Sequence, residues 1–212
     1  HASSGQTLSG SETRNLNRAY PGKANGNLTE MIAYGITTLI NEEDIDITVD
    51  LHEASPEYTT VNAIVAHENA IELANMALWD VEDYFSISIE KSPTNLHGLT
   101  HRELGDYTDT LALLMETANA SQGRLHGAIH SSLVVDGVDK FYARAAQYGA
   151  VTVPFGEDGI GITERCARHI SCLVAFCDEY LPEDDLYISL GDMPSFDEMV
   201  ENGIGAYLHS PE

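Results

Sequence analysis

Apolar and polar positions follow two different periods along this chain, and each period predicts one kind of element. Residues 45–52 alternate apolar and polar side chains, which is the period of a strand with two unlike faces. The run 110–119 is continuously apolar for several residues and predicts a strand buried on both faces. Shorter patterns of the same kind predict further strands at 62–66, 84–90, 150–155 and 186–190.

Helical periods occur between these strands. Asn27 is a cap candidate at the start of a helix over 28–40. Further helices are expected through Trp79 and Val81, over 138–148, over 161–181 and near 196–202. Residues 1–26 and 91–109 are predicted as loops, and the second is long enough to suggest a functional lid. The alternation predicts an α/β layered sheet in one domain over 1–212.

Composition excludes several classes of protein. The net charge is −24, from 34 acidic and 10 basic residues, so the surface repels nucleic acid and anionic membranes. A solvated acidic face explains this charge, and adaptation to salt is the alternative. No apolar run approaches the length of a membrane span, and residues 1–12 lack the apolar core of a signal peptide. Three cysteines, all within 161–181, suggest buried thiols in a reducing compartment, so we expect a cytoplasmic protein.

His52 is the first residue with candidate chemistry, because it lies near the end of a predicted strand. Asp50 is two residues earlier on the same strand face and could accept a hydrogen bond from the imidazole. Such an arrangement suits a metal ligand, although a structural, hydrogen-bonded histidine is the simpler interpretation of this motif alone.

Asn17 and Arg18 form a second candidate site. A guanidinium binds a carboxylate through two hydrogen bonds, and the asparagine amide adds a donor. Pro21 and Gly22 favour a turn that would hold the pair. The alternative is a structural loop with a surface arginine.

Glu116 follows the apolar run of its strand. Desolvation at such a position raises the pKa of a carboxyl group towards that of a useful general base. The alternative is a carboxylate that ends a strand and pairs with a cation.

The ordered set of motifs resembles the zinc carboxypeptidase superfamily, in its succinylglutamate desuccinylase and aspartoacylase branch. The resemblance covers about residues 14–181. It rests on NLNRAYPG at 15–22, DLHE at 50–53, and the apolar strand that ends in Glu116, together with the later segments ETANASQGRLHG and GITERCARHI.

This resemblance implies a three-layer α/β/α fold with a mostly parallel, mixed sheet and a zinc cofactor. It implies hydrolysis of an amide bond beside a free carboxylate, in a small peptide or an N-acyl amino acid. Its implied site residues are His52 as a zinc ligand, Glu116 as general base, Asn17 and Arg18 as carboxylate binders, Arg14 as the group that polarises the carbonyl, and Tyr107 on a mobile loop. Neither nucleic acid nor a membrane is an expected partner, and the oligomeric state stays open.

The chain departs from the family in one respect: no HxxE motif, which should supply two zinc ligands, precedes Asn17. We expect that the N-terminal strands and this motif lie outside the sequence. The alternative is a binding or structural module whose metal site has been lost. Three other sets of residues have ligand spacing, but each is interpreted as solvated: His97 with His101, His126 with His130, and His209 with Glu212. His169 is expected at the surface of its helix or as a cap.

Overall fold

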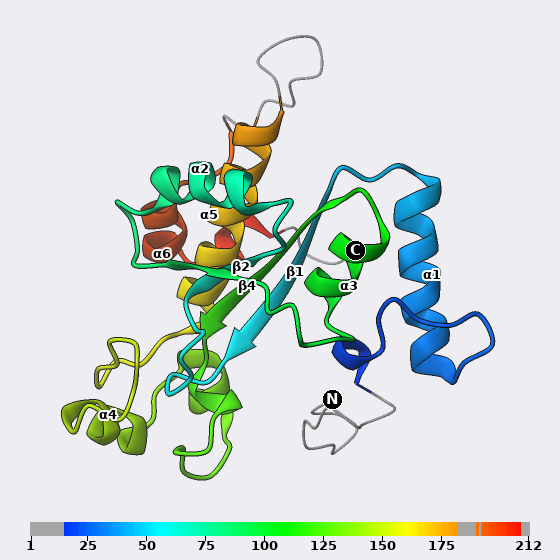
Figure 1. Ribbon diagram of the computed structural model, residues 1–212. Helices are drawn as coiled ribbons and strands as arrows, with labels where there is room; N and C mark the ends of the chain where they lie inside the picture. Colours follow the sequence, from blue (N-terminus) through cyan, green and yellow to red (C-terminus); the bar gives the residue numbers. More distant parts are fainter. Residues whose placement is uncertain (1–14, 182–189, 191, 209–212) are drawn as a thin grey trace. The chain divides into compact units, whose positions relative to one another are not determined.

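The computed structural model describes residues 15–181, 190 and 192–208 (Figure 1). The chain divides into two compact units. Unit 1 comprises residues 1–50, 65–72 and 90–114, and unit 2 comprises residues 51–64, 73–89 and 115–212. The boundary crosses the strands, so each unit contains part of the sheet. One catalytic domain over the whole chain stays a prediction.

The sheet has four strands in the order β1-β4-β2-β3. Each strand coincides largely with a predicted one, and the strands are β1 (Ile47–Ala54), β2 (Ala63–Ala66), β3 (Ser88–Lys91) and β4 (Leu111–Ala118). Every residue of β2 is buried, as its short apolar sequence predicts. The fold class predicted from the alternation of strands and helices, α/β, is therefore confirmed.

Hydrogen bonds at the strand ends give the directions of the strands. Leu111 N donates to Asp46 O over 2.7 Å, and eight residues later Asn119 N donates to Ala54 O over 2.8 Å. Equal steps along both chains make β1 and β4 parallel. By the same test β3 is parallel to β2, because Ser88 N donates to Asn62 O and Ser92 N donates to Ala66 O. β2 is antiparallel to β4, because His67 N donates to Ala112 O and Ala118 N donates to the side chain of Asn62. The sheet is mixed and mostly parallel.

Unit 1 contains the helix α1 (Leu28–Glu42), which begins where the sequence predicts. Asn27 Oδ1 accepts from Glu30 N over 3.1 Å, and Glu30 Oε2 accepts from Asn27 N over 2.9 Å. This reciprocal cap satisfies two amide groups that the first helical turn leaves without partners. The buried apolar core of the unit is formed by Tyr20, Ala33, Ile40, Leu104 and Ala112.

The loop expected at 91–109 is wrong in its second half, which forms the helix α3 (Thr100–Tyr107). Its sequence, THRELGDY, has one large aliphatic residue, so no apolar period predicts a helix here. The helix is held by a tertiary contact instead: Thr100 N donates to Asn17 Oδ1 over 2.7 Å. A cap supplied from 83 residues away is invisible to a local pattern.

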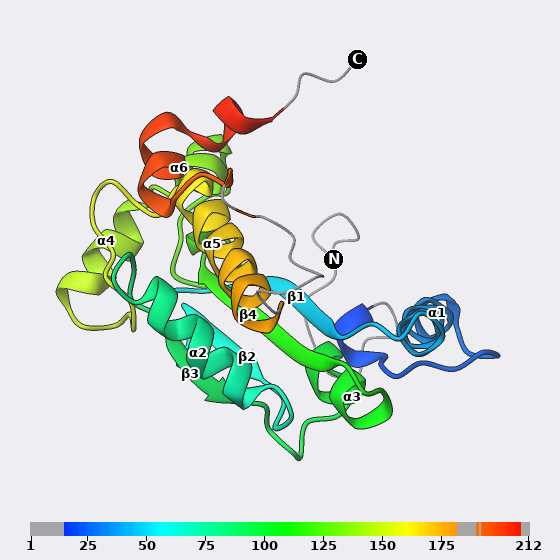
Figure 2. The ribbon, with the colours of Figure 1, turned by 90° about the horizontal axis from the view of Figure 1, so that it is seen from above.

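Unit 2 contains α4 (Lys140–Gln147), α5 (Ile162–Tyr180), α6 (Phe196–Asn202) and most of α2 (Ile71–Val81). α5 and α6 pack against each other (Figures 1 and 2). The rings of Phe85 and Phe196 lie 4.9 Å apart. An apolar core of unit 2 contains Ala54, Val61, Ala118, Ala120, Leu133, Tyr142, Val153, Phe155 and Ile160.

Three strand and loop predictions need correction. Residues 150–155 form no strand, because Pro154 lacks an amide donor and Thr152 instead bonds Pro56 O through both its N–H and its hydroxyl, each over 2.9 Å. The strand expected at 84–90 is reduced to 88–91. A 3₁₀ turn at Leu16–Arg18 interrupts the loop expected at 1–26. The expected strand at 186–190 falls almost entirely outside the described residues.

Among the described helices, none combines the length and the apolar character required to cross a bilayer.

Candidate functional site

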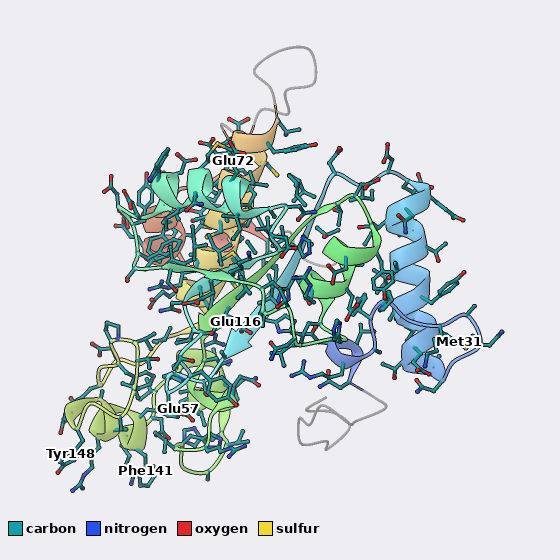
Figure 3. All side chains as sticks on the ribbon, viewed as in Figure 1. Met31, Glu57, Glu72, Glu116, Phe141 and Tyr148 are labelled. Atoms are coloured by element: carbon teal, nitrogen blue, oxygen red, sulfur yellow. The ribbon has the colours of Figure 1, made fainter. Side chains whose placement is uncertain are left out.

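His52 and Glu116 lie side by side near the carboxyl ends of two neighbouring strands in unit 2. Each is two residues before the end of its strand, and the parallel register of β1 and β4 places them opposite each other. His52 Nδ1 is 3.8 Å from Glu116 Oε1. Both side chains are half-buried, at 27% and 18% exposure. Figure 3 labels Glu116 on β4. The structure therefore brings together the two residues that the sequence selected from separate strands.

The opposite face of these strand ends is held by a network that sequence reasoning missed. Glu53 Oε1 accepts from Arg165 Nε over 2.6 Å, and Glu53 Oε2 accepts from Asn119 Nδ2 over 2.7 Å. Arg165 is only 3% exposed and also donates to two carbonyl groups, Ile160 O at 2.8 Å and Val134 O at 2.9 Å. The network ties the ends of β1 and β4 to α5. It thereby fixes the backbone that presents His52 and Glu116.

The sequence contains one signal for this network. Arginine is scarce in so acidic a chain, and Arg165 lies in the first turn of α5 beside apolar positions. A buried arginine is always charged and needs acceptors for its N–H groups, so it indicates a carboxylate nearby. The pattern does not show which of 34 acidic residues supplies it.

His169 is not at the surface, as the sequence suggested, but half-buried between α5 and the strand ends. Its Nε2 is 3.4 Å from Thr117 Oγ1, one residue after Glu116. Burial lowers the pKa of His169 below its ordinary value of 6.5, and this effect outweighs the raising effects of Glu53 and of a backbone hydrogen bond with His52. The imidazole is consequently neutral near pH 7.

Asn17 and Arg18 lie in unit 1, at the amino end of α3. Asn17 Oδ1 accepts from both Thr100 N (2.7 Å) and Thr100 Oγ1 (3.0 Å), so this amide has a structural role that the motif did not predict. Arg18 is exposed and donates to the Asn17 carbonyl. Gly22, with φ of +89°, packs against the backbone of α1, where a Cβ atom would lie 2.0 Å from Tyr34 N. The turn expected after Tyr20 is thus present.

The remaining predicted site residues are placed differently. Tyr107 is the last residue of α3 rather than part of a long loop, and its side chain is 60% exposed. Arg14 lies outside the described residues, as do His209 and Glu212. Asp50 belongs to unit 1, where its charge adds to the rise that burial produces in the pKa of Tyr20. Its predicted hydrogen bond to His52 stays a prediction.

The histidine pairs with helical spacing show no shared ligand geometry. His97 Nδ1 is 3.0 Å from Glu103 Oε1, whereas His101 is buried within α3, so its expected solvation is wrong. His126 Nδ1 donates to Gly127 O, and His130 Nδ1 accepts from Ser132 Oγ. Within residues 15–181, 190 and 192–208 no group of three or more His, Cys, Asp or Glu side chains could hold a metal ion.

Zinc centres in hydrolases take three protein ligands and keep one position open. The described residues fit part of such a centre: His52 offers one nitrogen ligand, and Glu116 is within reach as a base. They do not fit the whole, because two further ligands are not grouped with His52 in the part of the chain that the structure describes.

Comparisons with protein-family models, with curated proteins and with solved structures give no match to this chain.

Proposed function

We propose that this chain contains the general-base half of an amide hydrolase of the zinc carboxypeptidase type. The observation that supports the proposal is the pairing of His52 and Glu116 on adjacent parallel strands, with 3.8 Å between their nearest nitrogen and oxygen atoms. A general base must lie close to the metal that the histidine would ligate if it is to take a proton from a water molecule bound to that metal. The mixed, mostly parallel sheet suits the three-layer fold of that superfamily.

Glu116 performs the proton transfers in this proposal. Its carboxylate removes a proton from the attacking water and then delivers that proton to the nitrogen of the departing amine. Near pH 7 the base must be ionised, and the half-buried position at a strand end leaves it accessible to water. Glu53, Arg165 and Asn119 keep the two strand ends in register while this happens.

Zinc, when bound, would polarise the scissile carbonyl and acidify its water. His52 would be one ligand, and the other two would come from outside the described residues. Because one histidine cannot hold the metal alone, we expect the 212-residue chain by itself to bind zinc weakly.

The proposed substrates are small peptides or N-acyl amino acids with a free carboxylate next to the scissile amide. Arg18 and Asn17 are the residues proposed to bind such a carboxylate, and this part of the proposal concerns unit 1 alone. Arg18 is exposed, so its guanidinium is accessible to an anionic ligand.

A second candidate function is a carboxylate-binding module without catalysis. One observation favours it: the described residues contain no complete group of metal ligands. The two candidates differ in what zinc does. An enzyme turns over substrate only with metal, whereas a binding module retains its carboxylate ligand regardless of metal.

The test is hydrolysis of a panel of N-acyl amino acids by the longest polypeptide that the gene encodes, with zinc or with a chelator. We expect zinc-dependent release of the free amino acid, and much slower release when the α-carboxylate is blocked as a methyl amide. Carboxylate binding without hydrolysis, in the presence of zinc, would support the binding module. A rate of hydrolysis that is the same with zinc or chelator, and with a free or a blocked carboxylate, would contradict both candidates.

A further inference from the structure

Residues 140–156 differ in charge from the rest of the chain. This segment contains Lys140 and Arg144 but no acidic residue, although the whole chain has 34 acidic and 10 basic residues. It also contains Phe141, Tyr142, Tyr148 and Phe155. Two positive charges and four aromatic side chains thus lie together in one short part of unit 2, between Asp139 and Glu157.

α4 places four of these residues on one exposed face, here called the α4 surface: Lys140, Phe141, Arg144 and Tyr148. Lys140 and Arg144 are one turn apart, as are Arg144 and Tyr148, so they are neighbours on the helix. Lys140 Nζ is 5.2 Å from the centroid of the Phe141 ring, and Arg144 Cζ is 5.9 Å from that of Tyr148. The aromatic rings are 48% and 74% exposed. Figure 3 shows both pointing outward from α4.

The orientation of this helix is fixed from its other side. Asp139 Oδ1 accepts from the amides of Phe141 and Tyr142, which caps the first turn. Tyr142 is fully buried, and its hydroxyl donates to Glu57 Oε2 over 2.6 Å. The α4 surface is therefore preformed, and binding to it requires little ordering of the backbone.

The cations of the α4 surface are not neutralised within the described parts of the chain. No ion pair with a described carboxylate involves Lys140 or Arg144, whereas Arg165 pairs with Glu53 and Arg168 with Glu164. Exposed arginine beside tyrosine and phenylalanine is the composition that protein interfaces favour. A partner with carboxylates would complement these charges.

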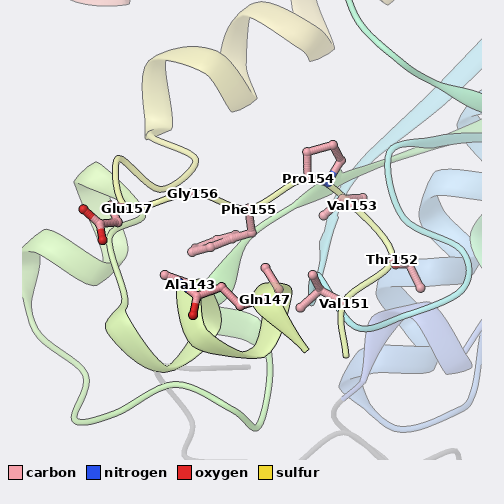
Figure 4. Close-up of a pocket in the computed structure, with 10 residues that line it drawn as sticks. Ala143, Gln147, Val151, Thr152, Val153, Pro154, Phe155, Gly156 and Glu157 are labelled. Carbon is pink, nitrogen blue, oxygen red and sulfur yellow. The ribbon is translucent and has the colours of Figure 1, made fainter. Parts of the chain in front are cut away.

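A groove of mixed lining adjoins the same helix, with alanine, valine and phenylalanine side chains beside Gln147, Thr152 and Glu157. It has a volume of about 610 Å³ and is lined by Ala143, Ala146 and Gln147 of α4 together with residues 151–157 (Figure 4). Gln147 is three residues after Arg144, so one wall of the groove continues into the α4 surface. Figure 4 shows the Phe155 ring above Ala143, with Val151 further along the groove. Side chains such as leucine fit a space of this size and lining.

We infer that the α4 surface and its groove bind an acidic peptide segment of a partner protein that also carries large aliphatic residues. Carboxylates of the segment contact Lys140 and Arg144, and an aliphatic side chain enters the groove. A nucleic acid fits less well, because its continuous phosphate charge would be repelled by a chain of net charge −24 over distances of about 10 Å. A short peptide segment contacts only the surface around Lys140 and Arg144, where the potential is positive.

The experiment measures fluorescence anisotropy of a fluorescein-labelled peptide of Glu, Asp and Leu residues as the 212-residue chain is added. Two control peptides replace every Leu by Ser, or every acidic residue by its amide. We expect saturable binding of the first peptide, weaker binding of both controls, and loss of affinity as salt is raised.

Variants then locate the site. K140Q/R144Q removes both cations and should weaken binding about tenfold, whereas K23Q/K91Q makes the same change of charge elsewhere and should leave binding unchanged. A146L should fill the groove and reduce the advantage of the Leu peptide over the Ser peptide. Unaltered thermal unfolding of each variant shows that the fold is retained.

Three results would overturn the inference. The first is equal binding of the Leu peptide by the unmodified chain and by K140Q/R144Q. The second is the absence of saturable binding to any acidic peptide. The third is tighter binding of a labelled single-stranded oligonucleotide than of the peptide.

Discussion

His52 Nδ1 and Glu116 Oε1 face each other over 3.8 Å, although 64 residues separate them along the chain. Two parallel strands produce this relationship, because their register places residues at equal distances from the strand ends beside one another. The pair is supported from the opposite face of the sheet by Glu53, Asn119 and Arg165.

Asn17 has a structural role that can be separated from its proposed role in binding a carboxylate. N17A removes the oxygen that caps α3 and should lower the free energy of unfolding by about 1 kcal/mol. N17D keeps a capping oxygen, so its stability in urea should stay near that of the chain. It also replaces the amide donor with a negative charge, so N-acyl amino acid binding should weaken. Equal free energies of unfolding for N17A and the unmodified chain would show that the Asn17 cap does not stabilise α3.

Arg165 should contribute far more to stability than an exposed cation does. R165M leaves Glu53 without its strongest donor and should lower the free energy of unfolding by about 2 kcal/mol, since the arginine is buried and the carboxylate partly exposed. K23A is the matched control, because Lys23 pairs with Glu30 at 74% exposure. Its effect should be below about 1 kcal/mol. Urea denaturation measures both, and similar losses would contradict the assigned network.

His169 should make stability depend on pH in a defined direction. Its folded pKa is lower than the unfolded value of 6.5, because burial disfavours the cation. The unfolded chain then binds more protons in this range, so stability is complete above pH 6.5 and falls as the pH falls from 6.5 through the folded pKa.

H169Q, which cannot titrate, is the control for that pH dependence. The difference in unfolding free energy between the chain and H169Q should shrink or reverse as the pH is lowered from 7 to 5. An NMR titration should show the His169 ring protonating below pH 6.5. A midpoint above 6.5 would contradict the neutral, buried imidazole.

Sequence patterns predicted the elements whose own side chains decide their structure. The apolar alternation of β1, the buried run of β4 and the Asn27 cap of α1 each have a local physical cause, and each prediction was confirmed. His52 and Glu116 were selected from local patterns too: Glu116 follows a buried apolar run, and His52 lies near the end of an alternating strand. Their roles in a site stay predictions.

Other features depend on distant residues and could not be predicted locally. α3 is capped by Asn17, and the extended segment around Thr152 is held by Pro56 rather than by a neighbouring strand. Arg165 and Glu53 are 112 residues apart, and no period connects them. His169 belongs to an amphipathic helix whose half-buried flank cannot be distinguished from its surface by sequence alone.

The most direct test of the proposed function is the rate at which E116Q, in the longest polypeptide that the gene encodes, hydrolyses an N-acyl amino acid with zinc present. Gln is nearly the same size as Glu but cannot accept a proton, so the rate should fall roughly 10²- to 10⁴-fold while unfolding in urea stays unchanged. E43Q, a matched change at the exposed carboxyl end of α1, should retain full activity. A rate for E116Q within a few-fold of that of the unmodified protein would contradict the assignment of Glu116 as the base.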